Sequence, residues 1–600
     1  MSIPTDTLLP RLATIALLLA SSAATCDSVC ASNINWYASV KGFGLSLKNR
    51  QHFGVGVRQH LFSTTTTDAI ICRGSHFSST VYGVRGGADN THDNDNDIDD
   101  EMRRLRKKWS DIIPATPSIA WPVSDTMVLG DDSTETTLGN RDGRMKALII
   151  MDGFSPYHGQ YIAHAARQNY GTAVIHVFSD FMTRYLSEVE GQKDHLSSRL
   201  PDLENVDDVN AWSSLLPPSM EICGIYCESD SGLEDSERLG VALGLKCHDG
   251  VNYARRDKFL MNKVVSEVGG LDVVKQKSCC TVEEAEDFAI ELGLGEDVTD
   301  DGRRVVVKPL RGVASDDVHL CSTLSALRKA FHKILNSPVF GSPKEAKHEQ
   351  VLVQEFAAGI EYAVDVVCRN GERKVAALWR YDKRAVNDAP FVYLCTELVS
   401  SISKEGVEQE VCKYVFKALE ALGVRWGLSH VEVIVGTSNT GKVQIRLVEV
   451  NCRQHNTDFM PLTNACMGYN ALDMVLAAYL GDAETEKTSS TSRGPRWESI
   501  PSLPTTHAHG AIVHFVSHVE GSISRIRFDV LEEIEDLPSV MDLHVYPQFM
   551  EVGNPIAKTI DIRSDTGWAH IMNDDEDEFR RDYSRIVELM KEMFEVEESN

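Results

Sequence analysis

The sequence predicts a mixed α/β and α+β protein, and three features of the chain support this class. From residue 146 to about residue 245, short apolar strand-like runs alternate with helical patterns, which indicates a parallel α/β layer. Residues 305–451 contain further strand-like runs with charged residues at one end or on one face. Residues 507–600 combine strand-like runs with an amphipathic helix. With 42% hydrophobic and 25% charged residues, the composition of the 600 residues is that of a soluble globular protein.

Residues 1–87 are interpreted as a presequence. Arg11 precedes an apolar run and a group of small residues, as in a secretory signal with a cleavable end, and the run is too short to span a bilayer comfortably. The Ser/Thr-rich, acid-poor stretch behind it has the composition of a transit peptide, which predicts entry into the secretory route and an organelle such as a plastid as destination. A disordered extension and a cytoplasmic location stay open as alternatives. Residues 88–143, whose first part (88–101) is dominated by Asp and Asn, are predicted to form an acidic disordered linker.

The first folded unit is predicted over residues 144–250. Lys146 to Met151 is a buried-strand run, a helical pattern follows at 159–169, and 173–178 is the next strand. No Gly-x-Gly-x-x-Gly follows the first strand, so dinucleotide binding gains no support from the sequence.

The second unit, residues 251–483, carries a series of charged or glycine-bearing segments. Arg255 to Met261 gives a helix a basic start, and the buried strand 305–309 ends near Lys308, where an ammonium can meet phosphate. The small polar turn at 312–317 is suited to lying over phosphates through its backbone N–H groups. Residues 351–362 then run from strand to turn to strand.

Two acid-bearing strands in the same unit have the pattern of a metal site. Within Arg446 to Arg453, apolar residues alternate with Glu449, Asn451 and Arg453, so these three side chains point to one face of a strand. Glu432 offers a second acid on the preceding strand-like run, across a short turn. Carboxylate and amide oxygens beside a guanidinium can hold a hard divalent ion and the adjacent phosphate oxygens. A single run of this kind is explained equally by an edge strand with a solvated polar face. Two such runs joined by a short turn favour a metal site.

The remaining chain is predicted to be a linker and a small terminal subdomain. Residues 484–506 are polar, with clustered Ser, Thr and Pro, as in a linker. Strands are expected near 511–516 and 523–528 in a C-terminal α+β subdomain over 507–600. An apolar stripe on the closing helix indicates a core face; it consists of Phe579, Tyr583, Ile586, Met590 and Phe594.

Taken in this order, the segments of the second unit resemble the ATP-grasp superfamily, over roughly residues 144–483. The likeness is closest to carboxylate–amine ligases of the L-amino-acid ligase and carnosine synthase kind, because of Glu-Tyr-Ala-Val-Asp-Val-Val at 361–367 followed by Trp-Arg-Tyr-Asp-Lys-Arg at 379–384. The resemblance implies a Rossmann-like pre-ATP-grasp domain, ATP-grasp lid and metal-bearing domains, and a small β-rich C-terminal segment.

The resemblance also implies how ATP would be held. Lys258 and Lys308 would contact the ATP phosphates or the adenine edge, with Gly312 and Ser315 in the turn over the phosphates. Glu361 would hold the ribose hydroxyls. The hinge that reads the adenine would consist of Gln354, Glu355, Phe356 and Ala357.

Metal and catalytic roles follow from the same resemblance. Glu432, Glu449 and Asn451 would coordinate one or two Mg²⁺ ions, or Mn²⁺, at the β- and γ-phosphates. Arg453 and Lys308 would be catalytic, since their positive charges would stabilise the phosphoryl group in transfer.

The implied reaction joins a small-molecule carboxylate to an amine through an acyl phosphate, with amino-acid-like substrates and release of ADP and phosphate. The implied protein is a possible homodimer. Two alternatives stay open: a non-catalytic ATP-binding regulatory protein, and another ATP-grasp enzyme such as a carboxylase or a nucleotide-pathway ligase. A formal net charge of −28 argues against nucleic acid or an anionic membrane as partner, and no apolar run predicts a stable membrane span.

Six residues around these motifs carry separate expectations. Asp317, together with Ala314, stands where the family usually has glycine, and its carboxylate would repel phosphate unless it turns outward. Asp365 is expected to be the polar face of a strand, and His430 and His455 to be structural histidines. Glu397 is a speculative contact for a substrate ammonium.

Overall fold

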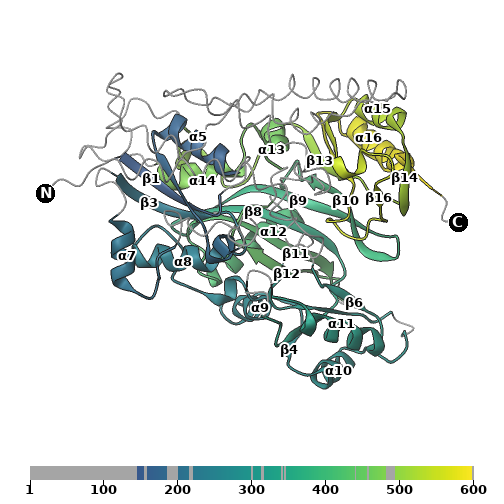
Figure 1. The fold of residues 1–600 in the computed structure, drawn as a ribbon, viewed down its shortest axis with the longest axis horizontal. Helices are drawn as coiled ribbons and strands as arrows, with labels where there is room; N and C mark the ends of the chain where they lie inside the picture. The colour runs from purple at the N-terminus through teal and green to yellow at the C-terminus, as the bar shows by residue number, and fades with distance from the viewer. Residues whose placement is uncertain are drawn as a thin grey trace, which may run out of the picture.

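The computed structural model describes most of the chain from residue 145 onward (Figure 1). The presequence and acidic linker predicted over 1–143 lie outside the described residues, as do Ala314 and Ser315. The described ranges are 145–153, 158–184, 200–214, 220–298, 302–312, 316–339, 342, 346–403, 405–438, 441–455, 459–481 and 494–597.

The first unit is a small parallel α/β layer, as the sequence predicts. Its three strands lie in the order β2-β1-β3, and residues 147–151 of β1 are completely buried. Helix α14 (Ala471–Leu480), from much later in the chain, packs against α5 and shares its hydrophobic core. The elements of the layer are β1 (Met145–Met151), α5 (His158–Tyr170), β2 (Ala173–Val177), α7 (Val206–Ser213), β3 (Met220–Cys227) and α8 (Leu233–Ala242).

A second unit, here called the lid, projects at the bottom of Figure 1. It is an antiparallel sheet of order β4-β7-β5-β6 whose core is closed by two helices. Helix α9 (Lys258–Glu267), capped by the Asp257 carboxylate, leads into it. The lid consists of β4 (Gln276–Cys279), α10 (Val282–Glu291), β5 (Val305–Pro309), β6 (His319–Cys321), α11 (Leu324–Asn336) and β7 (Val351–Glu355).

An antiparallel sheet of eight strands forms the centre of the molecule, in the order β12-β11-β8-β9-β10-β13-β17-β15. Helix α12 packs near its first half and α13 near its second. These elements are β8 (Ile360–Arg369), β9 (Glu372–Val386), β10 (Ala389–Leu398), α12 (Val407–Ala421), β11 (Gly427–Thr437), β12 (Val443–Asn451), α13 (Phe459–Met467), β13 (His509–His514), β15 (Val540–Val545) and β17 (Gly567–Asn573).

The remaining C-terminal elements cover the second half of that sheet. The predicted stripe is confirmed as a core face: Tyr583 is partly buried and the other four side chains are buried. The elements are β14 (Gly521–Ile526), α15 (Phe528–Glu535), β16 (Pro555–Ile556), α16 (Glu576–Leu589) and β18 (Phe594–Val596), with one-turn helices at Pro547–Phe549 and Met590–Glu592. Two one-turn helices elsewhere in the chain are Tyr253–Arg255, before α9, and Trp497–Ser499, before β13.

The sequence-based boundaries differ from this architecture at the C-terminal side. Strands β13, β17 and β15 continue the sheet of β8 to β12, so residue 506 does not separate two sheets. In the predicted linker 484–506, the structure describes residues 494–506, and this part packs against the first layer. Its Trp497 is buried in the core of that layer. Contacts between residues this far apart in the chain leave no local pattern in the sequence.

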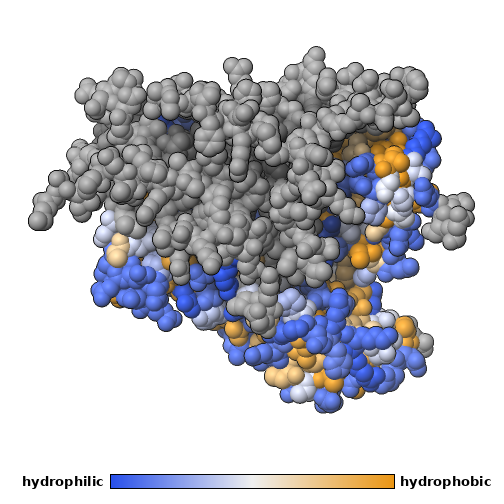
Figure 2. All heavy atoms as spheres, in the orientation of Figure 1, coloured by the Kyte–Doolittle hydropathy of each residue, from blue (hydrophilic) through white to orange (hydrophobic). Residues whose placement is uncertain are grey.

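The lid presents a largely polar surface on the side drawn in Figure 2. Figure 2 shows hydrophilic side chains over most of the visible lid, with hydrophobic ones in separate small groups. Within the described part of the chain, no helix combines the length and the apolar character that crossing a membrane requires.

Candidate active site

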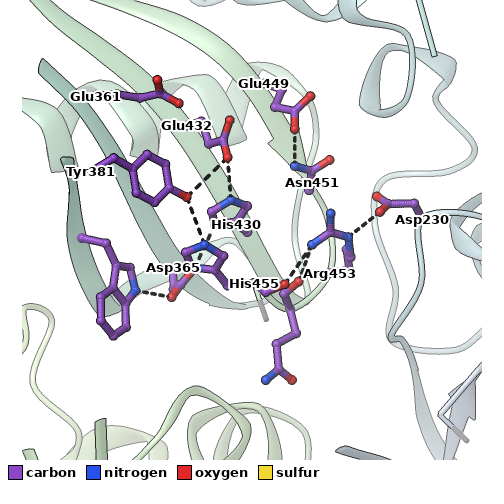
Figure 3. A network of polar contacts seen from close by, with 12 residues as sticks. Asp230, Glu361, Asp365, Tyr381, His430, Glu432, Glu449, Asn451, Arg453 and His455 are labelled. Atoms are coloured by element: carbon purple, nitrogen blue, oxygen red, sulfur yellow. Dashed lines mark hydrogen bonds and ion pairs between the residues drawn. The ribbon is translucent and has the colours of Figure 1, made fainter. Parts of the chain in front are cut away.

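Strands β11 and β12 bring the predicted metal ligands together. Their register pairs Glu432 with Glu449 and His430 with Asn451. Directly opposed residues of antiparallel strands point to the same face, so the two carboxylates and the amide meet there. The amide of Asn451 donates to Glu449 Oε1 at 2.8 Å, as Figure 3 shows. The two glutamate side chains are 15% and 17% exposed, so they are shielded but still reachable.

A third carboxylate, Glu361 on β8, lies beside this pair (Figure 3). Burial raises its pKa, and the negative charges of Glu432 and Glu449 add to the rise, while Lys383 opposes it. The Lys383 ammonium lies 2.7 Å from Glu361 Oε1 and 4.1 Å from the centre of the Tyr393 ring. We call Glu361, Glu432, Glu449 and Asn451 the acid face.

Two predicted phosphate-binding lysines lie at the acid face. Lys258, in the first turn of α9, contacts Glu449 Oε2 at 2.8 Å and donates to the carbonyl of Gly312 at 3.0 Å. Lys308 is buried near the end of β5. Burial and the neighbouring Lys258 lower the pKa of Lys308 to about 8, against the pull of the three glutamates. Together with Lys383, three ammonium groups therefore face three carboxylates.

The predicted adenine hinge lies where β7 passes into β8. Gln354 is buried and donates to Gln276 Oε1 at 3.0 Å. The carboxylate of Glu355 lies 3.2 Å from a guanidinium nitrogen of Arg446 on β12, which ties the hinge to the strand of Glu449.

Phe356, Ala357 and Gly359 of this connection pack closely. The ring of Phe356 stacks on Phe391 at 6.3 Å between centres, and Ala357 is buried. At Gly359 a Cβ atom would lie 2.2 Å from the carbonyl oxygen of Val435, so only glycine allows the turn to press on β11.

Arg453 lies just beyond the end of β12, buried, with its guanidinium on the loop that follows β3 (Figure 3). Its Nε is 2.6 Å from Asp230 Oδ2, and its Nη1 donates to the carbonyl of Gln454 at 2.6 Å. Sequence reasoning missed Asp230, because the pair is separated by 223 residues. A small cleft between Asp230 and the acid face is lined by Asp230, Leu233, Arg255, Arg256, Lys258, Met261, Gly312, Glu449, Val450, Asn451 and Cys452.

The carboxylate of Asp317 turns outward, to the lid helix α11, and does not point to the predicted phosphate site. The φ of Asp317, 51°, is left-handed, and its carboxylate lies 2.7 Å from the Lys333 ammonium on α11. Hydrogen bonds from His319 and Lys333 hold the pKa of Asp317 well below its ordinary value. The charge is therefore neutralised within the lid. Ser315 lies outside the described residues, and Gly312 faces the cleft.

The expectation for Asp365 is wrong, because this carboxylate is buried rather than part of a solvated face. The indole of Trp379 donates to its Oδ2 at 2.7 Å, and His430 and His455 lie 3.3 and 3.5 Å from its Oδ1. The two imidazoles stack at 3.7 Å with 23° between their planes. Three potential metal ligands thus lie together, but nearly parallel stacked rings cannot both point a nitrogen lone pair in their own plane at one ion.

The side chains around Asp365 hold the carboxylate of Glu432 in place and are not a metal site of their own. His430 Nε2 lies 3.1 Å from Glu432 Oε1, and the Tyr381 hydroxyl donates to the same oxygen at 3.4 Å. Burial alone would lower the pKa of His430, but its bonds to Asp365 and Glu432 raise it to about 9. Burial and the charge of His430 lower the pKa of His455 to about 4. One charged and one neutral imidazole thus stack behind the acid face, as structural histidines.

The expectation for Glu397 is also wrong. Its carboxylate lies 2.8 Å from Arg380 and 2.6 Å from Arg580 of α16. Because Tyr381 points to the acid face, its neighbour Arg380, and with it Glu397, lies on the opposite face of the sheet.

Comparisons with known proteins agree with this geometry. Residues 302–459 match the model of the ATP-grasp domain. Dapdiamide A synthase of Enterobacter agglomerans is 26% identical over 343 residues, which make up 56% of this chain and 74% of that protein. The crystal structure of an L-amino acid ligase from Bacillus licheniformis superposes with a TM-score of 0.50 at 17% identity, over 76% of this chain and 100% of that one. The ATP-grasp fold predicted from the sequence is thereby confirmed.

Proposed function

We propose that this chain, an enzyme of the ATP-grasp superfamily, joins a carboxylate to an amine through an acyl phosphate, with amino-acid-like substrates. The observation that carries the proposal is the acid face: Glu432 and Glu449 are paired across two strands, with Lys258 and Lys308 opposite them. Carboxylates and lysines that lie together, with Glu449 and Lys258 lining the adjoining cleft, suit a nucleoside triphosphate held through a cation.

The donor set of the acid face fits Mg²⁺ or Mn²⁺. Glu432, Glu449 and the amide oxygen of Asn451 are the oxygen ligands that such ions prefer. The Lys258 ammonium, 2.8 Å from Glu449 Oε2, shows that a positive charge is already accommodated there. When bound, the ion would neutralise the charge that develops on the phosphate oxygens.

The proposed reaction has two steps. A substrate carboxylate oxygen attacks the γ-phosphorus, the bond from that phosphorus to ADP breaks, and an acyl phosphate forms. The amine nitrogen then attacks the acyl carbon and loses a proton, and the bond from that carbon to phosphate breaks. Lys308 and Arg453 would stabilise the transferring phosphoryl group, and the lid would hold the reactants and exclude water, which otherwise hydrolyses the acyl phosphate.

The two alternatives make different predictions for ADP release. A regulatory protein would bind ATP without turnover; the side chain of Asp317, turned to Lys333, gives that reading no support. A carboxylase would need bicarbonate in place of the substrate carboxylate.

The test is to measure ADP and phosphate release with a panel of amino-acid pairs, with bicarbonate as the comparison. For an active pair, the carboxylate is labelled with ¹⁸O. The acyl-phosphate route transfers one labelled oxygen to the released phosphate. Amine-independent ADP release, or phosphate without label, would contradict the proposal.

Two further properties are proposed from the sequence. We propose that the protein is a homodimer, which light scattering of the purified chain tests. We also propose that residues 1–87 direct it into the secretory route, which the location of a fluorescent protein fused behind these residues tests.

A further inference from the structure

A buried carboxylate lies at the edge of the first layer that contributes Asp230 and Leu233 to the cleft. Asp152 directly follows β1, its φ of 58° is left-handed, and its side chain is buried. Within the part of the chain that the structure describes, no Lys, Arg or His forms an ion pair with this carboxylate. Ligand sites of parallel α/β layers lie at the carboxyl ends of the strands, which is where Asp152 stands. Its place in the fold therefore suits a part in the site.

Hydrogen bonds from two loops converge on Asp152. The backbone N–H of Ser179, after β2, donates to its Oδ1 at 2.8 Å. The hydroxyl of Ser229, after β3, donates to its Oδ2 at 2.5 Å. Both serines are buried. A buried carboxylate without a cation opposes folding, and hydrogen bonds of this kind offset part of that cost. The carboxylate and the two loops are therefore fixed together.

The loop after β3 takes its shape from this contact. While the Ser229 hydroxyl donates to Asp152, its oxygen accepts from the N–H of Gly232 at 2.8 Å and closes a four-residue turn. A Cβ atom at Gly232 would lie 2.5 Å from Asp152 Oδ2, so the turn packs directly on the carboxylate. Asp230 is the second residue of this turn. Asp152 thus determines where the Asp230 side chain is presented.

Asp230 in turn holds Arg453, which follows the proposed ligand Asn451 by two residues. Asp230 Oδ2 lies 2.6 Å from Arg453 Nε, and both side chains are buried. Arg453 Nη1 donates to the carbonyls of Gln454 and His455 at 2.6 and 3.2 Å. The first layer therefore fixes Nε, while the loop after β12 fixes Nη1. A displaced Asp230 would leave the guanidinium held at Nη1 without its partner at Nε.

We propose that Asp152 is a positioning residue for Arg453: it holds the turn 229–232, and with it Asp230, where the guanidinium meets the transferring phosphoryl group. The inference rests on the proposed function, because that function assigns Arg453 to the phosphoryl transfer. It gives the first layer a part in the chemistry. If Asp152 were a purely structural carboxylate, its loss would lower stability and leave the surviving folded enzyme fully active.

The first experiment measures kcat and the Kd for MgATP in Asp152→Ala and Ser229→Ala. Asp152→Ala should lower kcat about tenfold to hundredfold, because a shift of about 1 Å in a positioned group is that costly. Ser229→Ala removes one hydrogen bond and should cost about threefold to tenfold. The Kd should stay at the wild-type value in both. The matched control is Asp582→Ala, a buried carboxylate on α16 that accepts from the N–H of Ser539 at 2.9 Å; it should lose stability and keep kcat.

The second experiment observes Arg453 directly, without turnover. Phenylglyoxal modifies accessible guanidinium groups, and mass spectrometry locates each modified arginine. In Asp152→Ala, Arg453 should react about fivefold faster or more, because the contact that keeps it buried opens more often. Arg255 is the internal control: it is also buried beside the cleft, but its guanidinium is held by Glu237 at 2.7 Å and should stay protected.

Since Asp152 acts through Arg453, adding Asp152→Ala to Arg453→Ala should lower kcat no further. Additive losses, an equal loss of kcat in Asp582→Ala, or unchanged reactivity of Arg453 would each overturn the proposal. Should Asp152→Ala fail to fold, Ser229→Ala carries the same measurements. The modification needs no substrate, so it decides whether Asp152 holds Arg453 even where turnover is absent. Absence of amine-dependent ADP release from the wild-type protein would instead contradict the proposed function itself.

Discussion

The two halves of the eight-stranded sheet are built for different purposes. The half formed by β8, β11 and β12 buries Glu361, Glu432 and Glu449 close together on one face. The half formed by β13, β17 and β15 packs apolar side chains such as Phe515 and Ile571 against α15 and α16. Adjacent buried carboxylates oppose folding, whereas buried apolar surface favours it. We infer that the second half stabilises a sheet whose first half is optimised for binding.

Two pKa shifts support this reading, while at Glu432 the hydrogen bond and charge of His430 outweigh burial and lower the pKa. The Glu361 carboxyl and the Lys308 ammonium are both shifted toward their neutral forms, since burial raises the former pKa and lowers the latter. Each would be relieved by a bound ligand of opposite charge. The predictions below test whether changes in one half affect activity and changes in the other affect stability.

The largest effect is expected for Glu449→Ala. Removing this carboxylate takes a proposed ligand from the cation and a partner from Lys258, and should abolish amine-dependent ADP release, by about a thousandfold or more. Circular dichroism should show an intact fold. Glu372→Ala, an exposed carboxylate at the start of β9, is the control and should keep full activity. Equal turnover in both variants would show that Glu449 is not a metal ligand.

In the other half, Phe515→Ala should act on stability. Phe515 is completely buried beyond the end of β13, and truncation of such a ring costs about 3–5 kcal/mol. Denaturant unfolding should shift to lower concentration, with a smaller shift for Phe515→Leu. The Kd for MgATP below the unfolding transition should stay at the wild-type value; a matching loss of affinity would show that the two halves are not separable.

Lys308 gives the acid half a pH dependence. Its pKa of about 8, lowered by burial and by Lys258, means that the ammonium is present below pH 8 and lost as the pH rises through it. The Kd for ATP should therefore rise about tenfold between pH 7 and pH 9. In Lys308→Arg the charge persists, so the profile should be flat over this range. A parallel rise in both proteins would assign the titration to another group.

The smallest effect is expected for Arg580→Ala, on the face opposite to the site. Glu397 keeps Arg380 as a partner when Arg580 is removed, and a half-exposed pair contributes about 1 kcal/mol or less. Thermal unfolding should shift slightly, with KM for both substrates unchanged. A raised KM for the amine would bring back Glu397 as a substrate contact.

The parts of this protein that the sequence predicts are those with a local period. Alternation in β12 places Glu449 and Asn451 on one face, and the apolar runs predict β1, β5 and the stripe of α16. The bond of Arg453 to Asp230 and the junction of β10 with β13 depend on segments distant in the chain. Asp365 was misjudged because a polar residue on a strand has the same pattern whether water or an imidazole faces it.

The junction of β10 with β13 also limits how the chain can be shortened. Four residue pairs, from Cys395–Val513 to Leu398–Gly510, join the two strands. A protein ending near residue 505 would leave the backbone N–H and C=O groups of β10 without partners along a newly made border. Such borders recruit strands from other molecules. The catalytic part of this enzyme, expressed without the C-terminal segment, is therefore prone to self-association. In the full chain, the C-terminal segment prevents this by pairing with the edge of β10.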